Sequence, residues 1–157
     1  MGSKALIVYY SLQGSTRKIA EAIHNNTKGQ LFEISPEKEY SVASAYTKGI
    51  IQATRKTKPP IKNTLMNLNE YETIFIGTPV WAFTMAPPIL TFLNQYNLEN
   101  KKIIPFCTHR GNAGKTIADI AVNCPNSEIM EGKDFYKVSN KDHDYINNEV
   151  QKWIQSM

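Results

Sequence analysis

The stretch Ser11-Leu12-Gln13-Gly14-Ser15-Thr16 lies between an apolar run, residues 5–10, and a segment with helical spacing, residues 18–23. Six consecutive apolar or aromatic residues, rich in strand formers, are typical of a strand buried on both faces of a sheet. In the following segment Ile19, Ala20 and Ile23 share one helical face. The sequence therefore predicts a central strand, a short turn and a helix.

The turn combines hydroxyls, an amide and a glycine at the start of a helix. Free N–H groups and the positive end of the helix dipole point into such a turn, which makes it a binding site for phosphate. Gly14 permits a backbone conformation that other residues resist, and the hydroxyls of Ser11, Ser15 and Thr16 can donate hydrogen bonds to phosphate oxygens. The alternative is a plain N-cap, in which Ser15 or Thr16 holds the helix end without a ligand.

The length, apolar runs and cysteine content of the chain limit the class of protein to which it can belong. A chain of 157 residues fits one domain, residues 1–157. No run approaches the roughly 18 apolar residues that span a bilayer, and the N-terminal segment has no signal-peptide layout. Cys107 and Cys124 are too few for a disulfide framework and lack metal-ligand spacing. We expect a cytoplasmic protein with two reduced thiols, no membrane association and no metal.

The basic charge does not predict nucleic-acid binding. The net charge is +4, and it is not concentrated in one block. The densest basic stretch, Arg55-Lys56-Thr57-Lys58, has no aromatic residue on which a base could stack. We expect it to be a solvated helix end.

Strands and helices alternate along the chain. Further strands are expected at 30–34, 72–77, 102–107 and, weakly, 128–130, although Pro105 is unusual in a sheet interior. Helices are expected at 41–56, from Pro87, at 115–122 and after a capping box formed by Ser139 and Asp142. This alternation predicts a parallel sheet covered by helices on both faces. Ligands bind such sheets beyond the carboxyl ends of the strands, where the loops 11–16, 78–84 and 107–114 lie.

The second and third loops suggest what the ligand is. Trp81 follows a central strand directly, where it would be partly exposed and could stack on a planar ligand. The alternative is that Trp81 packs against the next helix. The third loop, 107–114, offers glycines and several backbone donors. A phosphate turn, a flat aromatic side chain and a donor-rich loop fit a flat heterocycle linked to a phosphate, which is the shape of flavin mononucleotide (FMN).

With these three loops the chain resembles the flavodoxin family. Residues 11–16 are similar to its phosphate loop, whose pattern is Thr or Ser, any residue, Thr, Gly, Asn or Ser, Thr. Thr78-Pro79-Val80-Trp81 resembles its first flavin loop, and Cys107-Thr108-His109-Arg110-Gly111 its second. The resemblance implies a flavodoxin-like, doubly wound three-layer α/β sandwich, with a five-stranded parallel sheet in the order 2-1-3-4-5.

The resemblance also implies FMN as the cofactor. The turn 11–16 would hold the phosphate, Trp81 would stack on the isoalloxazine ring, and the backbone of 108–111 would meet the pyrimidine edge. Gln13 stands where the family often has Thr, and the second flavin loop has no Tyr, so a second aromatic face is either missing or supplied by His109. The implied cofactor-binding residues are Ser11, Leu12, Gln13, Gly14, Ser15, Thr16, Thr78, Pro79, Val80, Trp81, Ala82, Phe83, Cys107, Thr108, His109, Arg110 and Gly111.

The implied function is that of an FMN-binding electron carrier between a flavin reductase and electron-acceptor proteins, with no catalytic acid, base or nucleophile of its own. The alternative is a small FMN-dependent NAD(P)H:quinone-type reductase. The chain has neither a G-x-G-x-x-G turn nor a separate nicotinamide domain, which favours the carrier. A flavin-free structural module is a third class. Known flavodoxins are usually strongly acidic, and this chain departs from them in its basic charge.

Two other phosphate-related classes fit less well. Gly111-Asn112-Ala113-Gly114-Lys115-Thr116 ends like a Walker A loop, but His109 stands where that motif needs its first glycine. A response-regulator receiver shares the topology but needs acidic residues at strand ends, where this chain has Tyr10-Ser11 and Gly77-Thr78.

Overall fold

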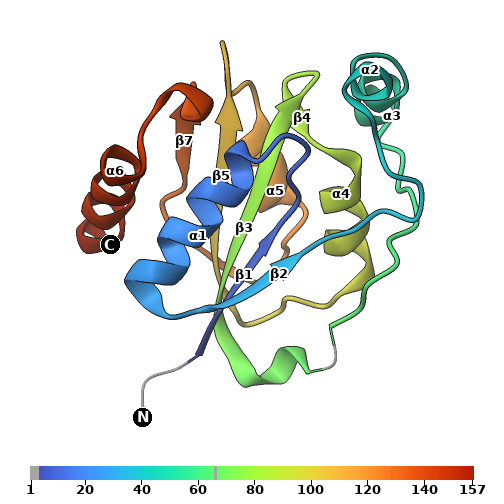
Figure 1. The fold of residues 1–157 in the computed structure, drawn as a ribbon. Coiled ribbons are helices and arrows are strands. Elements are labelled where there is room, and N and C mark those ends of the chain that lie inside the picture. The colour runs from blue at the N-terminus through green and yellow to red at the C-terminus, as the bar shows by residue number, and fades with distance from the viewer. Residues whose placement is uncertain (1–3, 66) are drawn as a thin grey trace.

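The computed structural model of the protein describes residues 4–65 and 67–157 and shows a twisted sheet between two layers of helices (Figure 1). The strands are β1 (Lys4–Tyr9), β2 (Gln30–Glu33), β3 (Tyr71–Trp81), β4 (Thr84–Met85), β5 (Lys102–His109), β6 (Glu128–Ile129) and β7 (Lys133–Tyr136). The α-helices are α1 (Ser15–Thr27), α2 (Val42–Ser44), α3 (Ile50–Thr54), α4 (Pro87–Gln95), α5 (Thr116–Val122) and α6 (His143–Ser156). The π-helix η1 (Ala45–Gly49) and the 3₁₀-helices η2 (Leu68–Glu70) and η3 (Val138–Asn140) complete the elements described.

The sheet has the order β2-β1-β3-β5-β6, and these neighbours are all parallel. β7 also pairs with β5 in parallel, so β6 and β7 share the fifth position, while β4 pairs with β3 in an antiparallel hairpin. If β5 is counted as the fourth parallel strand and β6 with β7 as the fifth, the observed order is the expected order 2-1-3-4-5, which is confirmed. Within residues 4–65 and 67–157 the sheet has seven strands, two more than the five expected, because the fifth position is divided and β4 is added.

Pro105 accounts for the division of the fifth strand. In a parallel sheet, every second residue of a strand forms its backbone hydrogen bonds with the same neighbouring strand. Ile103 of β5 bonds toward β6, because its carbonyl accepts from the Met130 N–H at 2.8 Å. Pro105, two residues on, faces the same side but has no N–H to donate. Pairing stops after Ile129 and resumes at Lys133, opposite Phe106. The proline thus lies where the edge strand is interrupted.

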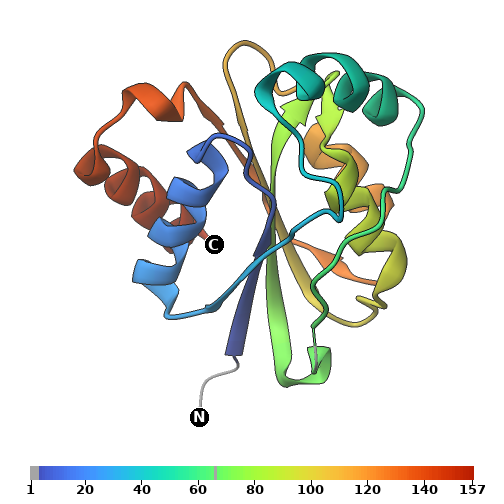
Figure 2. The same ribbon diagram turned by 45° about the vertical axis from the view of Figure 1, so that its right-hand side comes forward.

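Both faces of the sheet are buried, which explains the continuous apolar run in β1. Leu6, Val8 and Tyr10 belong to the core under α4 and α5, whereas Ile7 and Tyr9 belong to the core under α1 and α6. Figure 2 shows α1 and α6 together on one side of the sheet and the other α-helices on the opposite side. The prediction of helices on both faces is confirmed.

Several boundaries differ from those expected. β3 continues through Trp81 and β5 through His109, so parts of the two expected loops are strand. The segment expected to be one helix over 41–56 comprises α2, η1 and α3, a continuous helix that we call the 42–54 helix. The capping box of Ser139 and Asp142 is not formed. Asp142 alone caps α6, accepting from the Tyr145 N–H at 2.8 Å.

Across residues 4–65 and 67–157, no helix is both long and apolar enough to cross a membrane.

Candidate functional site

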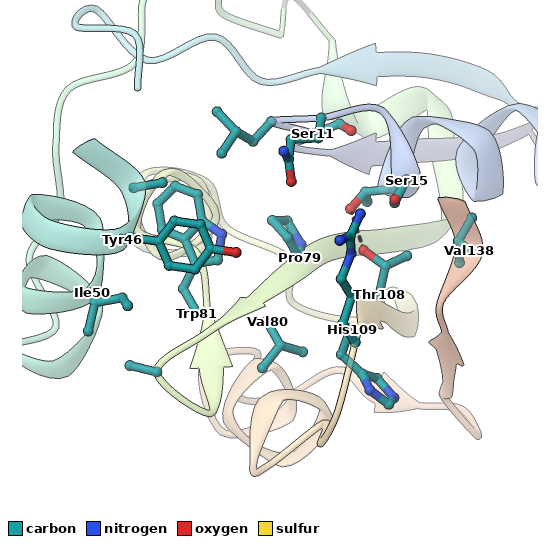
Figure 3. Close-up of a pocket in the computed structure, with 16 residues that line it drawn as sticks. Ser11, Ser15, Tyr46, Ile50, Pro79, Val80, Trp81, Thr108, His109 and Val138 are labelled. Atoms are coloured by element: carbon teal, nitrogen blue, oxygen red, sulfur yellow. Dashed lines mark hydrogen bonds between the residues drawn. The ribbon is translucent and has the colours of Figure 1, made fainter. Parts of the chain in front are cut away.

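A pocket opens at the carboxyl edge of the sheet, where the ends of β1, β3 and β5 lie side by side (Figure 3). Twelve of the predicted residues line it: Ser11, Leu12, Gln13, Ser15, Thr16, Pro79, Val80, Trp81, Ala82, Thr108, His109 and Arg110. Four further residues line it that the sequence did not single out: Ala45, Tyr46, Ile50 and Val138. The three loops thus form one site, as their positions after parallel strands predict.

The turn between β1 and α1 is closed by the side chain of Ser11. Its Oγ accepts from the N–H of Gly14 at 3.1 Å and from the N–H of Arg17 at 3.2 Å. Gly14 precedes the helix with φ 100° and ψ −9°, in the left-handed region. The first intrahelical bond runs from Lys18 N–H to the Gly14 carbonyl at 3.0 Å.

The N–H groups of Ser15 and Thr16 come before that first bond. A helix start leaves such donors without intrahelical partners, and here they lie at the pocket together with the positive end of the α1 dipole. The N-cap alternative required Ser15 or Thr16 to hold the helix end, but the Ser11 hydroxyl holds it. The turn has the donors that a phosphate group needs.

A buried hydrogen bond ties this turn to the end of β5. Thr16 and Thr108 are both buried, and their hydroxyl oxygens lie 2.8 Å apart. Their residue positions are 92 apart in sequence, and the bond holds the first and third loops in a fixed relation. The Thr16 hydroxyl, predicted to donate to phosphate, is thus bonded to Thr108 within the protein.

Trp81 is more buried than predicted, with 9% of its surface exposed. Its ring meets Tyr10 and Tyr40 edge to face, at centroid distances of 5.8 and 5.0 Å. A Cβ on Gly49 would lie 2.8 Å from a carbon of the Trp81 ring, so the 42–54 helix packs closely against it. Trp81 is therefore packed within the protein, as the alternative to a stacking role required, and its neighbours include Tyr10, Tyr40 and Gly49.

The hairpin after Trp81 turns on two non-glycine residues with positive φ. Ala82 has φ 52° and Phe83 has φ 65°, which lets Trp81 pair with Thr84 across a two-residue turn. Ala82 lines the pocket, whereas Phe83 lies outside it with 65% of its surface exposed.

Tyr46 is the main residue that sequence reasoning missed. The sequence predicted a helix over 41–56 but placed no site residue on it. In the structure the buried positions are Ala45, Gly49 and Ala53, and Tyr46 is 69% exposed at the pocket. Small residues recur at every fourth position in this helix, and this pattern indicates which stripe of the helix is buried. Tyr46 lies next to that stripe.

His109 does not offer an aromatic face to the pocket. Its Nε2 lies 2.7 Å from a carboxylate oxygen of Asp134 on β7, and the ring lies 5.6 Å from Tyr136. Figure 3 shows the imidazole turned away from the pocket. Arg110 lines the pocket with its side chain exposed, and its guanidinium donates to the Ser139 hydroxyl at 3.1 Å.

The other predicted site residues do not line the pocket. Thr78 is buried, with its hydroxyl donating to the Pro79 carbonyl at 2.8 Å and accepting from the Ala86 N–H at 2.9 Å. Cys107 is also buried within β5, and burial raises the pKa of its thiol to about 12. Gly14 acts through the shape of the turn. Gly111 lies outside the pocket lining, like Phe83.

The Walker-like segment is occupied by contacts within the protein. Thr116, which would bind magnesium in a Walker A loop, is buried and donates its hydroxyl to the Ala113 carbonyl at 2.6 Å. The Lys115 N–H donates to the Phe83 carbonyl at 2.9 Å. In the parts of the chain that the structure describes, no cluster of three His, Cys, Asp or Glu residues could hold a metal ion.

Comparison with known proteins agrees with this fold. The structure is similar to that of a protein from Bacteroides eggerthii assigned as a flavoprotein, with a TM-score of 0.81 and 25% identity over 99% of this chain and 98% of that one. It is also similar to a flavoprotein from Lactobacillus acidophilus NCFM in complex with FMN, with a TM-score of 0.76 and 26% identity over 98% of this chain and 99% of that one. No curated protein matches the chain.

The sequence model for flavodoxin matches residues 4–157, nearly the whole chain. That match covers all three loops of the pocket, and the strand order agrees with the one the family implies. The chain belongs to the flavodoxin family.

Proposed function

We propose that the protein binds one FMN in this pocket and carries electrons between a reductase and acceptor proteins. The observation that supports this most strongly is the convergence of a donor-rich helix start, an aromatic wall and the end of β5 in one pocket. The similar Lactobacillus acidophilus flavoprotein is in complex with FMN, which supports the choice of cofactor. Membership of the flavodoxin family supports the role in electron transfer.

The lining residues suit the parts of FMN. The N–H groups of Ser15 and Thr16, at the positive end of α1, would hold the phosphate. Leu12, Val80 and Ile50 give the pocket apolar walls against which a flat heterocycle can lie. Arg110 places a cation at the pocket, where it favours a ligand that gains negative charge on reduction.

FMN supplies the redox chemistry, and the protein supplies binding, orientation and electrostatics. Among the residues that line the pocket, His109 is the histidine, and its Nε2 lies 2.7 Å from a carboxylate oxygen of Asp134. It is thus not aimed at a bound ligand as a proton donor. This supports a carrier over a reductase with acid–base chemistry of its own.

The two functions differ in how the bound flavin becomes reduced. FMN-loaded protein is mixed with NADH or NADPH in a stopped-flow spectrometer, with and without a separate NADPH-dependent flavoprotein reductase. We expect slow bleaching of the flavin absorbance with either nucleotide alone and fast bleaching when the reductase is added. Rapid reduction by a nucleotide alone, with turnover of a quinone, contradicts the carrier and supports the reductase.

A further inference from the structure

The ring of Trp81 is largely taken up by packing within the protein. Only 9% of the residue is exposed, and two tyrosine rings meet it edge to face at interplanar angles of 89° and 83°. The backbone at Gly49 approaches it so closely that a Cβ there would lie 2.8 Å from the ring. A side chain held in this way positions its neighbours but offers little free surface to a ligand.

Tyr46 is in the opposite situation. It lines the same pocket, and 69% of its surface is exposed, the largest fraction among the aromatic side chains that are exposed. Among the residues that the structure describes, it forms no aromatic pair, whereas Trp81 forms two. In Figure 3 its hydroxyl points toward the middle of the pocket. An exposed, unpaired ring in a pocket is available to a flat ligand.

The local structure explains how Tyr46 comes to lie there. Ala45, Gly49 and Ala53 form the buried stripe of the 42–54 helix, and the small size of Gly49 lets the helix approach Trp81. Tyr46 lies in η1, a π-helical turn, in which each hydrogen bond spans one residue more than in an α-helix. π-helical turns are uncommon in proteins, and those that do occur are often found at functional sites. The helix thus holds Tyr46 at the pocket wall.

We propose that Tyr46 supplies the aromatic face that stacks on the flavin, and that Trp81 is a positioning residue that holds the 42–54 helix against the site. This inference rests on the proposed function, since it concerns the same ligand. It differs from the role that the family resemblance gave to Trp81, and it places a flavin contact on a helix that none of the three predicted loops includes.

The test compares Tyr46→Ala and Tyr46→Phe with Tyr145→Ala, a control that removes a half-exposed tyrosine from α6, outside the pocket. Apoprotein is titrated with FMN, and quenching of flavin fluorescence is recorded together with thermal stability. We expect Tyr46→Ala to weaken FMN binding about 5-fold to 150-fold, the usual range for loss of one stacked aromatic ring, and to relieve quenching. Tyr46→Phe and Tyr145→Ala should bind like wild type.

Each other outcome overturns the inference in a recognisable way. Wild-type affinity and quenching in Tyr46→Ala overturn the stacking role and leave the proposed function intact. Equal weakening in Tyr46→Phe and Tyr46→Ala assigns the effect to the hydroxyl, which also overturns stacking. If wild-type protein binds no FMN, the proposed function fails and the inference fails with it. Because Tyr46 is exposed, we expect unchanged thermal stability in the apoprotein, so misfolding does not confuse the result.

Discussion

Gly14 is the residue at which the backbone of the phosphate turn takes a conformation unfavourable for other amino acids. Its φ is 100°, and a Cβ added there would have no atom within 4 Å. Space is therefore no obstacle to a side chain, and any cost of substitution reports the backbone conformation alone. Gly111, in the loop after β5, has equally open space and no such φ, which makes it a matched control.

We expect Gly14→Ala to lower the free energy of unfolding by about 1–2 kcal/mol, the cost of a left-handed conformation for an L-residue. It should also weaken FMN more than riboflavin, because the strained turn holds the phosphate donors. Urea denaturation of the apoprotein and ligand titration measure the two effects. Gly111→Ala should be close to wild type in both. Equal effects of the two substitutions would contradict this account of the turn.

Arg110 is the charged side chain expected to act most directly on the flavin. It lines the pocket, whereas the ring of His109 is bound to Asp134. Reduction adds negative charge to the flavin, and a nearby cation favours the charged form. Arg110→Ala should therefore lower the potential of the final one-electron reduction of bound FMN, by roughly 59 mV for each tenfold loss of preference for the fully reduced form.

The control for Arg110 is Lys115→Ala, which removes an exposed cation outside the pocket lining. A spectroelectrochemical titration should show little change in this variant or in His109→Ala. A larger shift in Lys115→Ala than in Arg110→Ala would mean that net charge, and not position, sets the potential.

At the scale of elements, the 42–54 helix is the part of the site that depends most on close packing. Gly49 approaches Trp81 so closely that a methyl group would lie 2.8 Å from the ring. We expect Gly49→Ala to destabilise the protein by about 1–3 kcal/mol, the usual cost of overpacking, even though alanine favours helices. It should also weaken FMN, because the helix carries Tyr46.

Lys48→Ala is the control for Gly49→Ala, since Lys48 is exposed on the same turn. Chemical denaturation of both variants should separate them clearly. A Gly49→Ala protein as stable as wild type would show that the helix shifts without cost and that its contact with Trp81 is not needed.

Elements were predictable from sequence where burial alone determines them. The apolar run before Ser11 predicts β1 because both faces of that strand are covered, and the alternation of elements predicts the strand order. The ends of β3 and β5 were not predictable, because they are set by pairing between distant residues, such as Thr78 with Cys107 and Pro79 with Thr108. The hairpin turn at Ala82 and Phe83 lacks the Asn-Gly or Asp-Gly signal of such turns.

The same distinction between local sequence and distant contacts applies to the site. The phosphate turn follows from residues adjacent in sequence, and it lies at the pocket as expected. The orientation of His109 depends on Asp134, 25 residues away, and the exposure of Tyr46 depends on which stripe of its helix packs against Trp81. Neither is contained in a local pattern.

At the scale of the whole molecule, buried thiols make stability depend on pH. Burial raises the pKa of Cys107 to about 12 and that of Cys124 to about 11, above the unfolded value of about 8.5. Above about pH 8.5 the unfolded chain therefore loses thiol protons that the folded protein keeps. The stability that these two groups contribute is complete below that pH and is lost as pH rises toward the folded pKa values.

We expect the free energy of unfolding to fall above about pH 9, by up to about 1.4 kcal/mol per pH unit for each thiol. Urea denaturation between about pH 8 and pH 10 measures this slope in wild type and in Cys124→Ala, which removes one of the two groups. The variant should lose stability less steeply. Identical slopes would show that the thiols are not the cause.

The central claim is that the pocket at the ends of β1, β3 and β5 holds FMN, with the start of α1 binding its phosphate. The most direct measurement is a titration of the apoprotein with FMN and with riboflavin, which lacks the phosphate, followed by flavin fluorescence or calorimetry. We predict one FMN per chain and clearly weaker binding of riboflavin, with the difference reduced in Gly14→Ala. Equal affinity for the two flavins, or no binding of either, would contradict the account.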